Sequence, residues 1–163
     1  MEHQTDGTPE EHHRAGLALL DRGQGEEAFD HLSRAYLADP QNARYRSSYA
    51  LALALVKGQF LGAAELARAA IRHEYHNPDL YLNLARIYLT FEFRAEAVRF
   101  LRRGLMVDPQ HEPIIEALKG LGVRRRPPLR FLPRGHLLNR LIGRMQARLV
   151  RPLNPPSSDA SRA

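Results

Sequence analysis

The sequence of 163 residues contains no cysteine and no tryptophan, and aromatic residues make up only 7% of it. The absence of cysteine excludes disulfide bonds, thiol chemistry and every metal or iron–sulfur site built on thiolates. Long apolar runs are also absent, because the longest one, Tyr49 to Val56, is far shorter than the roughly 20 residues that span a bilayer. The polar first residues lack the basic and apolar regions of a secretory signal. We therefore expect a soluble cytoplasmic protein, which at most lies peripherally on a membrane.

The composition is that of an ordinary globular chain, but its charge is unevenly distributed. Hydrophobic residues make up 44% and charged residues 26%, which excludes a chain that is disordered throughout. Residues 1–118 hold 13 Lys and Arg against 17 Asp and Glu, whereas residues 119–163 hold 11 against a single acid, Asp159. The two net charges, −4 and +10, add to the +6 of the whole chain. This division predicts a mildly acidic body followed by a functionally separate basic extension.

The body repeats itself with a period of 34 or 35 residues. Ala28, Ala63 and Ala97 fall on this spacing. Further columns with the same spacing are Ala35, Ala70 and Gly104; Gly16, Leu51 and Ala85; and Gly23 and Gly58. Asp39-Pro40 and Asp108-Pro109 lie 69 residues apart, which is two periods. A period of this length indicates stacked helical repeats.

Each unit carries the pattern of two helices joined by a short turn. In the first unit, apolar residues recur at helical spacing over 15–20, and the glycine-containing segment 21–25 then interrupts the pattern. The apolar stripe of the following helix ends at Asp39-Pro40. Small residues are expected where the two helices cross, because only Ala or Gly lets their backbones approach closely.

These residues resemble the tetratricopeptide repeat, a helix–turn–helix unit of 34 residues. The positions that carry the resemblance are clearest in the third unit and are Tyr81, Leu84, Ala85, Tyr88, Ala97, Gly104 and Pro109. The resemblance implies an all-α fold, a right-handed α-solenoid of antiparallel helix pairs. The expected units are about 9–42, 43–77 and 78–111, followed by a capping helix in 112–122 and preceded by a flexible N-terminus, 1–8.

The second unit departs most from the family pattern. Tyr75 stands where a closing proline is expected, and the first proline after it is Pro78. Because proline cannot continue a helix beyond its first turn, Pro78 marks the latest end of the second helix of this unit. We therefore expect this helix to run longer than its counterparts.

The resemblance also implies where a partner binds. In the family, the first helix of each pair lines a concave groove that holds a peptide or helix of a partner protein. The corresponding positions here are His13, Leu17, Leu20, Ser48, Ala52, Leu55, Val56, Leu82, Asn83, Arg86 and Leu89. This groove is more apolar than charged, which favours an amphipathic helix as its ligand. The alternative for any single leucine is that it faces the neighbouring repeat instead.

One variety of the family binds the C-terminal carboxylate of heat-shock chaperones through Lys, Asn and Arg at fixed groove positions. Those positions hold His13, Leu17, Tyr49, Asp79 and Asn83 in this sequence. A carboxylate requires cationic or amide donors, and Asp79 would repel it. The sequence therefore argues against binding of chaperone C-termini.

The basic extension, 123–151, is rich in arginine. Arg124–Arg126 precede two prolines, which predicts an extended segment, and residues 136–150 then show an apolar helical stripe opposite a row of arginines. The candidate contact residues are Arg124, Arg125, Arg126, Arg130, Arg134, Arg140, Arg144 and Arg148. Residues 152–163 are rich in Pro and Ser and are expected to be disordered.

Four interpretations of the amphipathic helix near 136–150 remain open. It docks on the chain's own body, binds an acidic or apolar surface of a partner protein, lies on an anionic membrane, or contacts nucleic acid. Nucleic acid is the least favoured, because few aromatic residues are available to stack on bases. In the first interpretation, the helix occupies the chain's own concave groove until a partner displaces it.

The sequence carries no recognisable catalytic or metal-binding pattern. Nucleotide-binding, zinc-protease and serine-hydrolase motifs are absent. Among the histidines, His12 and His13 diverge on a helix, and His73 and His76 lack a third ligand nearby. We therefore predict a non-catalytic adaptor without metal or cofactor, which binds a partner protein in its groove and uses the basic tail for a second contact. The alternative is a peripheral membrane- or nucleic-acid-associated factor that acts through the tail.

Overall fold

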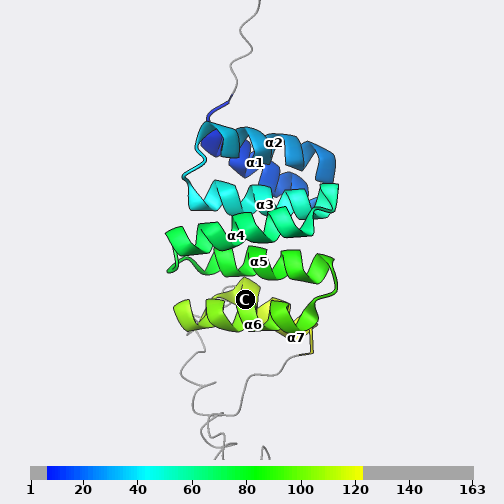
Figure 1. Cartoon of the computed structure of the whole chain (residues 1–163), viewed down its shortest axis with the longest axis vertical. Helices are drawn as coiled ribbons and strands as arrows, with labels where there is room; N and C mark the ends of the chain where they lie inside the picture. The colour runs from blue at the N-terminus through cyan, green and yellow to red at the C-terminus, as the bar shows by residue number, and fades with distance from the viewer. Residues whose placement is uncertain (1–6, 123–163) are drawn as a thin grey trace, which may run out of the picture. The chain divides into compact units, whose positions relative to one another are not determined.

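The computed structural model describes residues 7–122, and within this range the chain forms seven α-helices and no strand. The helices are α1 (Pro9–Asp21), α2 (Gly25–Ala38), α3 (Ala43–Lys57), α4 (Phe60–His73), α5 (Pro78–Thr90), α6 (Arg94–Val107) and α7 (Glu112–Gly120). Figure 1 shows them stacked in chain order, from α1 and α2 at one end to α6 and α7 at the other. Each of the pairs α1–α2, α3–α4 and α5–α6 packs as a hairpin, and neighbouring pairs pack on one another. The predicted all-α solenoid of antiparallel helix pairs is confirmed.

The first helix of each pair begins at a residue whose side chain caps it. Thr8 and Glu11 form a reciprocal capping box at the start of α1, with a hydrogen bond of 2.7 Å from the Thr8 backbone N–H to the Glu11 carboxylate. Asn42 and Asn77 accept hydrogen bonds from the first backbone N–H groups of α3 and α5. His111 does the same for α7. These caps satisfy N–H groups that have no partner within the helix.

The second helices, α2, α4 and α6, have no side-chain cap and instead follow tight turns. The turns contain a left-handed residue at the same repeat position, and its φ is 75° at Gly23, 65° at Gly58 and 63° at Glu92. Glycine adopts this conformation without steric cost, whereas the Cβ of Glu92 makes it unfavourable. The third turn is therefore strained at a position where the first two are not.

The expectation of a longer second helix in the second unit is wrong. Helix α4 ends at His73 and has 14 residues, the same length as α2 and α6. Pro78 is instead the first residue of α5, where its missing N–H removes no helical hydrogen bond. The proline therefore marks the start of the next helix and not the end of the preceding one.

Small residues allow the two helices of each pair to approach closely, as the repeat pattern predicts. Ala28, Ala63 and Ala97 are fully buried. A Cβ added at Gly16 would lie 2.5 Å from Cγ of Leu32, well inside van der Waals contact. The larger core residues fill the remaining space between helices, and the fully buried ones are Leu32, Leu80, Leu84, Ile87, Leu101 and Ile114.

Helix α7 covers the last pair with one apolar face. Ile114, Ile115 and Leu118 are buried, while Glu112 and Glu116 are exposed. A polar outer face on the last helix keeps the end of such a stack in contact with water. The expectations for residues 1–6 and for 123–163, including the amphipathic helix and the candidate arginines, lie outside the described residues.

Candidate functional site

The groove residues predicted from the sequence lie on α1, α3 and α5, which pack side by side. Apart from Val56 and Asn83, they recur at i, i+4 and i+7 within each helix and therefore occupy one stripe of it. The surface that these stripes form is called the first-helix face and comprises His13, Leu17, Leu20, Ser48, Ala52, Leu55, Leu82, Arg86 and Leu89. A direct contact of 2.9 Å between His13 Nε2 and Ser48 Oγ joins the stripe of α1 to that of α3.

Polar side chains link α1 to α3 near the starts of both helices. The Tyr45 hydroxyl donates a hydrogen bond of 2.9 Å to the Glu10 carboxylate, next to the contact between His13 and Ser48. The ring of His13 also lies 5.0 Å from that of Tyr45, measured between centroids. These contacts engage the side chains of Glu10, His13, Tyr45 and Ser48 with one another.

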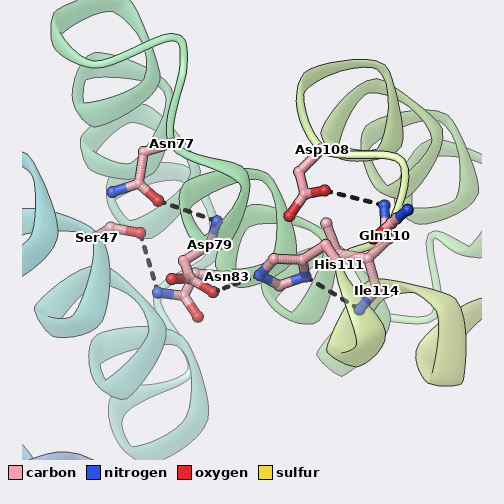
Figure 2. A network of polar contacts seen from close by, with 8 residues as sticks. All are labelled: Ser47, Asn77, Asp79, Asn83, Asp108, Gln110, His111 and Ile114. Atoms are coloured by element: carbon pink, nitrogen blue, oxygen red, sulfur yellow. Dashed lines mark hydrogen bonds and ion pairs between the residues drawn. The ribbon is translucent and has the colours of Figure 1, made fainter. Parts of the chain in front are cut away.

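The same kind of contact continues toward the end of the stack, as Figure 2 shows. The Asn83 amide on α5 donates to the Ser47 hydroxyl on α3 at 3.2 Å. Asp79 on α5 lies 3.0 Å from His111 Nε2. Because His111 Nδ1 accepts the hydrogen bond of the Ile114 N–H, its Nε2 carries the proton and donates to Asp79. We call these four contacts the polar ladder: Glu10–Tyr45, His13–Ser48, Ser47–Asn83 and Asp79–His111.

Burial determines the charge of His13. Only 3% of this residue is exposed, and the pKa of its imidazole is lowered from 6.5, first by burial and then by the nearby Arg44. The imidazole is therefore neutral at neutral pH and bonds to Ser48 as an uncharged group. His13 thus joins two repeats and does not present a cation to a ligand.

The predicted groove residues divide into a buried set and an accessible set. The buried set consists of His13, Ser48, Ala52 and Leu82, none of which is more than 5% exposed. The accessible set consists of the exposed Leu17, Leu55 and Arg86 and the half-buried Leu20, Val56, Asn83 and Leu89. Most of the accessible residues lie in the C-terminal halves of α1, α3 and α5, whereas the contacts between α1 and α3 lie near the N-terminal ends of these helices.

Three leucines of the accessible set occupy the same repeat position. Leu20, Leu55 and Leu89 are 35 and 34 residues apart, and each lies one or two residues before the end of its helix. We call them the leucine row. Leu55 is 49% exposed, and Leu20 and Leu89 pack partly against the core. The row presents one apolar edge across all three repeats.

Of the five positions compared above with those that bind chaperone C-termini, all but the exposed Leu17 are engaged in internal contacts. Tyr49 stacks on Tyr36 with their ring centroids 4.8 Å apart and their planes at 8°. Asp79 and Asn83 belong to the polar ladder. These contacts leave no cationic cluster at this point of the face.

Sequence reasoning did not single out Glu10, Tyr45, Ser47 or His111. A usable signal exists for Tyr45, because it follows Glu10 by the same 35 residues that separate Ser48 from His13. Polar residues one period apart on neighbouring first helices are thus candidates for direct contact. The separations of Ser47 from Asn83 and of Asp79 from His111 are 36 and 32 residues and carry no such signal.

Among residues 7–122, no three His, Asp or Glu side chains lie close enough together to hold a metal ion. In the same part of the chain, no helix combines the length and the apolar character that crossing a membrane requires.

Comparison with known families identifies the repeat. Residues 54–121 match the family model described as tetratricopeptide repeat. The matched residues, 54–121, are therefore tetratricopeptide repeats. The resemblance drawn from Tyr81, Tyr88, Gly104 and their neighbours is therefore confirmed. No curated protein matches the sequence.

Solved tetratricopeptide repeat structures share the fold. YrrB, described as a TPR protein with an unusual peptide-binding site, is 21% identical, with a TM-score of 0.56 over 71% of this chain and 59% of YrrB. The first TPR of Spaghetti (RPAP3), bound to the HSP90 peptide SRMEEVD, is 19% identical, with a TM-score of 0.55 over 71% and 90% of the two chains. The Arabidopsis OM64 TPR domain is 23% identical, with a TM-score of 0.56 over 71% and 94%. At these identities, the likeness establishes the fold.

Proposed function

We propose that this tetratricopeptide repeat protein is a non-catalytic adaptor that binds a segment of another protein on its first-helix face. The observation that carries the proposal is the leucine row, which crosses all three repeats at one position. Fully burying a leucine contributes roughly 1.5–3 kcal/mol, so the exposed half of Leu55 offers about 1 kcal/mol to a ligand. An amphipathic helix with apolar residues at i, i+3, i+4 and i+7 matches such an edge.

The structural neighbours support a protein as the partner. The RPAP3 domain was solved with an HSP90 peptide, and YrrB is described as having a peptide-binding site. We do not extend the proposal to chaperone C-termini, because Asp79 and Asn83 are engaged in the polar ladder and no cationic cluster stands beside them. The proposed ligand is therefore bound mainly through apolar side chains.

Peptide display followed by variant binding tests the proposal. Short random peptides would be selected on the full chain, and the affinity of the enriched peptides measured by fluorescence anisotropy. We expect Leu55→Asp to weaken binding about tenfold, because it places a charge in the apolar edge. Leu37→Asp is the matched control, since Leu37 is 72% exposed but lies on α2. Equal affinities for both variants, or no enriched peptide at all, would contradict the proposal.

We further propose that the basic extension makes a second contact with an acidic surface of the partner. Support comes from the net charge of +10 over residues 119–163. A chain ending at Gly122 should retain peptide binding on the first-helix face but lose a salt-sensitive part of its affinity for the whole partner. Salt-sensitive binding of the full chain to anionic vesicles or RNA, with no effect of the truncation on partner binding, would favour the membrane or nucleic-acid alternative instead.

A further inference from the structure

A second candidate surface is formed by the second helices of the last two pairs. A groove with a volume of about 510 Å³ runs between α4 and α6. Both helices pack against α5, and Tyr81 of α5 lines the groove between them. The Tyr81 hydroxyl donates a hydrogen bond of 2.9 Å to the backbone carbonyl of Tyr75, which holds its ring in place. We call this surface the arginine-rimmed groove.

The groove exposes large apolar side chains to water. Tyr75 and Met106 line it and are 71% and 83% exposed, and Ile71 and Phe100 lie beside them. Exposed apolar side chains gathered in a concave surface are typical of interaction sites, whereas single ones are not. A ligand side chain seated here would remove this apolar area from water.

Arginines surround these apolar side chains. Arg68, Arg72 and Arg103 line the groove, and none of them pairs with a carboxylate among residues 7–122. Arg103 lies over the ring of Phe100, 5.5 Å from its centroid, and Arg68 donates a hydrogen bond to the Tyr88 hydroxyl. These contacts position the guanidinium groups before any ligand arrives. A guanidinium in this state retains donors in the geometry that suits a carboxylate.

The surface continues along α4 beyond Arg68. A second hollow of about 380 Å³ is lined by Phe60, Leu61 and Phe93, and Arg68 borders both hollows. Leu61 is 81% exposed. Among residues 7–122, the only acidic side chain that lines either hollow is Glu96, in the smaller one. Two apolar hollows thus flank a central cation along the length of one helix, which is about 20 Å for 14 residues.

We propose that the arginine-rimmed groove binds an acidic amphipathic segment of a partner protein. An apolar side chain of that segment packs among Tyr75, Phe100 and Met106, and its carboxylates pair with Arg72 and Arg103. Charge complementarity selects this occupant, because a basic segment, such as residues 123–151 of this chain, would meet three uncompensated arginines. The lining of this groove comes mostly from α4 and α6, whereas the leucine row lies on α1, α3 and α5. The groove would therefore give the adaptor a second, independent binding site.

Three synthetic peptides of equal length test the inference on the full chain. The first carries leucines on one helical face and glutamates beside them, the second replaces the glutamates by lysine, and the third replaces the leucines by serine. We expect the first to bind more tightly than either of the others in fluorescence anisotropy. The double variant Arg72→Glu/Arg103→Glu should weaken its binding by about tenfold or more, because each substitution turns an attraction into a repulsion. Met106→Ala should weaken it to a lesser degree.

Two controls separate this site from the first-helix face. Arg99→Glu makes one such charge reversal at an exposed position of α6 that does not line the groove, and it should leave the affinity unchanged. Leu55→Asp should also leave it unchanged, and this distinguishes the inference from the proposed function. Peptide binding that is lost in Leu55→Asp, that ignores the arginine pair, or that is equal for the acidic and basic peptides would overturn it, as would the absence of binding. Circular dichroism of each variant would verify that the exposed substitutions leave the helices intact.

Discussion

Replacing Gly16 by alanine tests how tightly α1 packs on α2. The new Cβ would lie 2.5 Å from Cγ and 2.8 Å from Cδ2 of Leu32, and 3.3 Å from the carbonyl oxygen of Ala28. Leu32 and Ala28 are both fully buried, and a close-packed core lets neither move without displacing its neighbours. The added methyl group therefore clashes with atoms of Leu32 and Ala28 that cannot move aside.

Two effects of opposite sign determine the free energy of unfolding of Gly16→Ala. Overpacking a well-packed core costs about 1–3 kcal/mol. Alanine inside a helix is more favourable than glycine by about 1 kcal/mol, and Gly16 lies in the middle of α1. The added Cβ would lie only 2.5 Å from Cγ of Leu32, so we place the packing cost in the upper part of its range. We therefore expect the free energy of unfolding to fall by about 1–2 kcal/mol.

Two further variants isolate the packing contribution. Gly62→Ala also lies within a helix, α4, but its nearest neighbour is Cδ2 of Leu53 at 4.0 Å, an ordinary contact. It should raise the free energy of unfolding by about 0.5–1 kcal/mol. In a Leu32→Ala background, the obstructing side chain is gone, so adding Gly16→Ala should be neutral or stabilising. The resulting coupling energy should lie at about 1–3 kcal/mol.

Urea denaturation of the full chain, followed by the helical circular dichroism signal, measures the parent and its four variants on one scale. A shift of the midpoint at constant slope reports stability, whereas a changed slope would indicate altered cooperativity. The reasoning is refuted if Gly16→Ala is as stable as the parent chain. It is equally refuted if the substitution costs the same in the Leu32→Ala background, since the loss would then not come from contact with Leu32.

Three more predictions concern a strained turn, a buried histidine and the core. Glu92→Gly should stabilise the chain by about 0.5–1 kcal/mol in the same urea assay, because glycine relieves the left-handed backbone that Gly58 already adopts at the equivalent position. Since burial lowers the pKa of His13 from 6.5, the unfolded chain binds a proton that the folded chain does not, and stability should fall as the pH drops from about 6.5 to 5. Unfolding measured across this range should show a shallower fall for His13→Gln than for the parent, while the exposed control His73→Gln keeps the parent's slope. Leu84→Ala should cost about 2–5 kcal/mol by leaving a cavity at a fully buried position, and a thermal midpoint close to that of the parent would contradict the packing described for it.

Much of the fold could be predicted from local patterns in the sequence. Helix geometry within one unit explains the small residues at Ala28, Ala63 and Ala97 and the glycine turns. Because the sequence repeats with a period of 34 to 35 residues, each of these signals occurs more than once and is easier to recognise. The same reasoning placed the end of α4 wrongly. A proline such as Pro78 is compatible both with the end of one helix and with the first turn of the next, so its position alone does not locate the end of α4. A proline shows where two helices part but not how the intervening residues are divided between them.

The candidate site was predictable only in outline. Helical spacing places Leu55 and Ser48 on the same stripe of α3, but it cannot tell that Leu55 is half exposed while Ser48 is buried against His13. That difference arises from the neighbouring repeat, whose side chains cover one end of the stripe and not the other.

The sequence by itself determined the helices and the repeat, because these depend on residues close together in the chain or one period apart. Only the tertiary structure decided which groups remain accessible. The pairing of Asp79 with His111 and the gathering of Arg72, Tyr75 and Arg103 in one groove depend on how far each helix is rotated against the next. That rotation is set by the packing of all the helices together, so no single unit of the sequence records it.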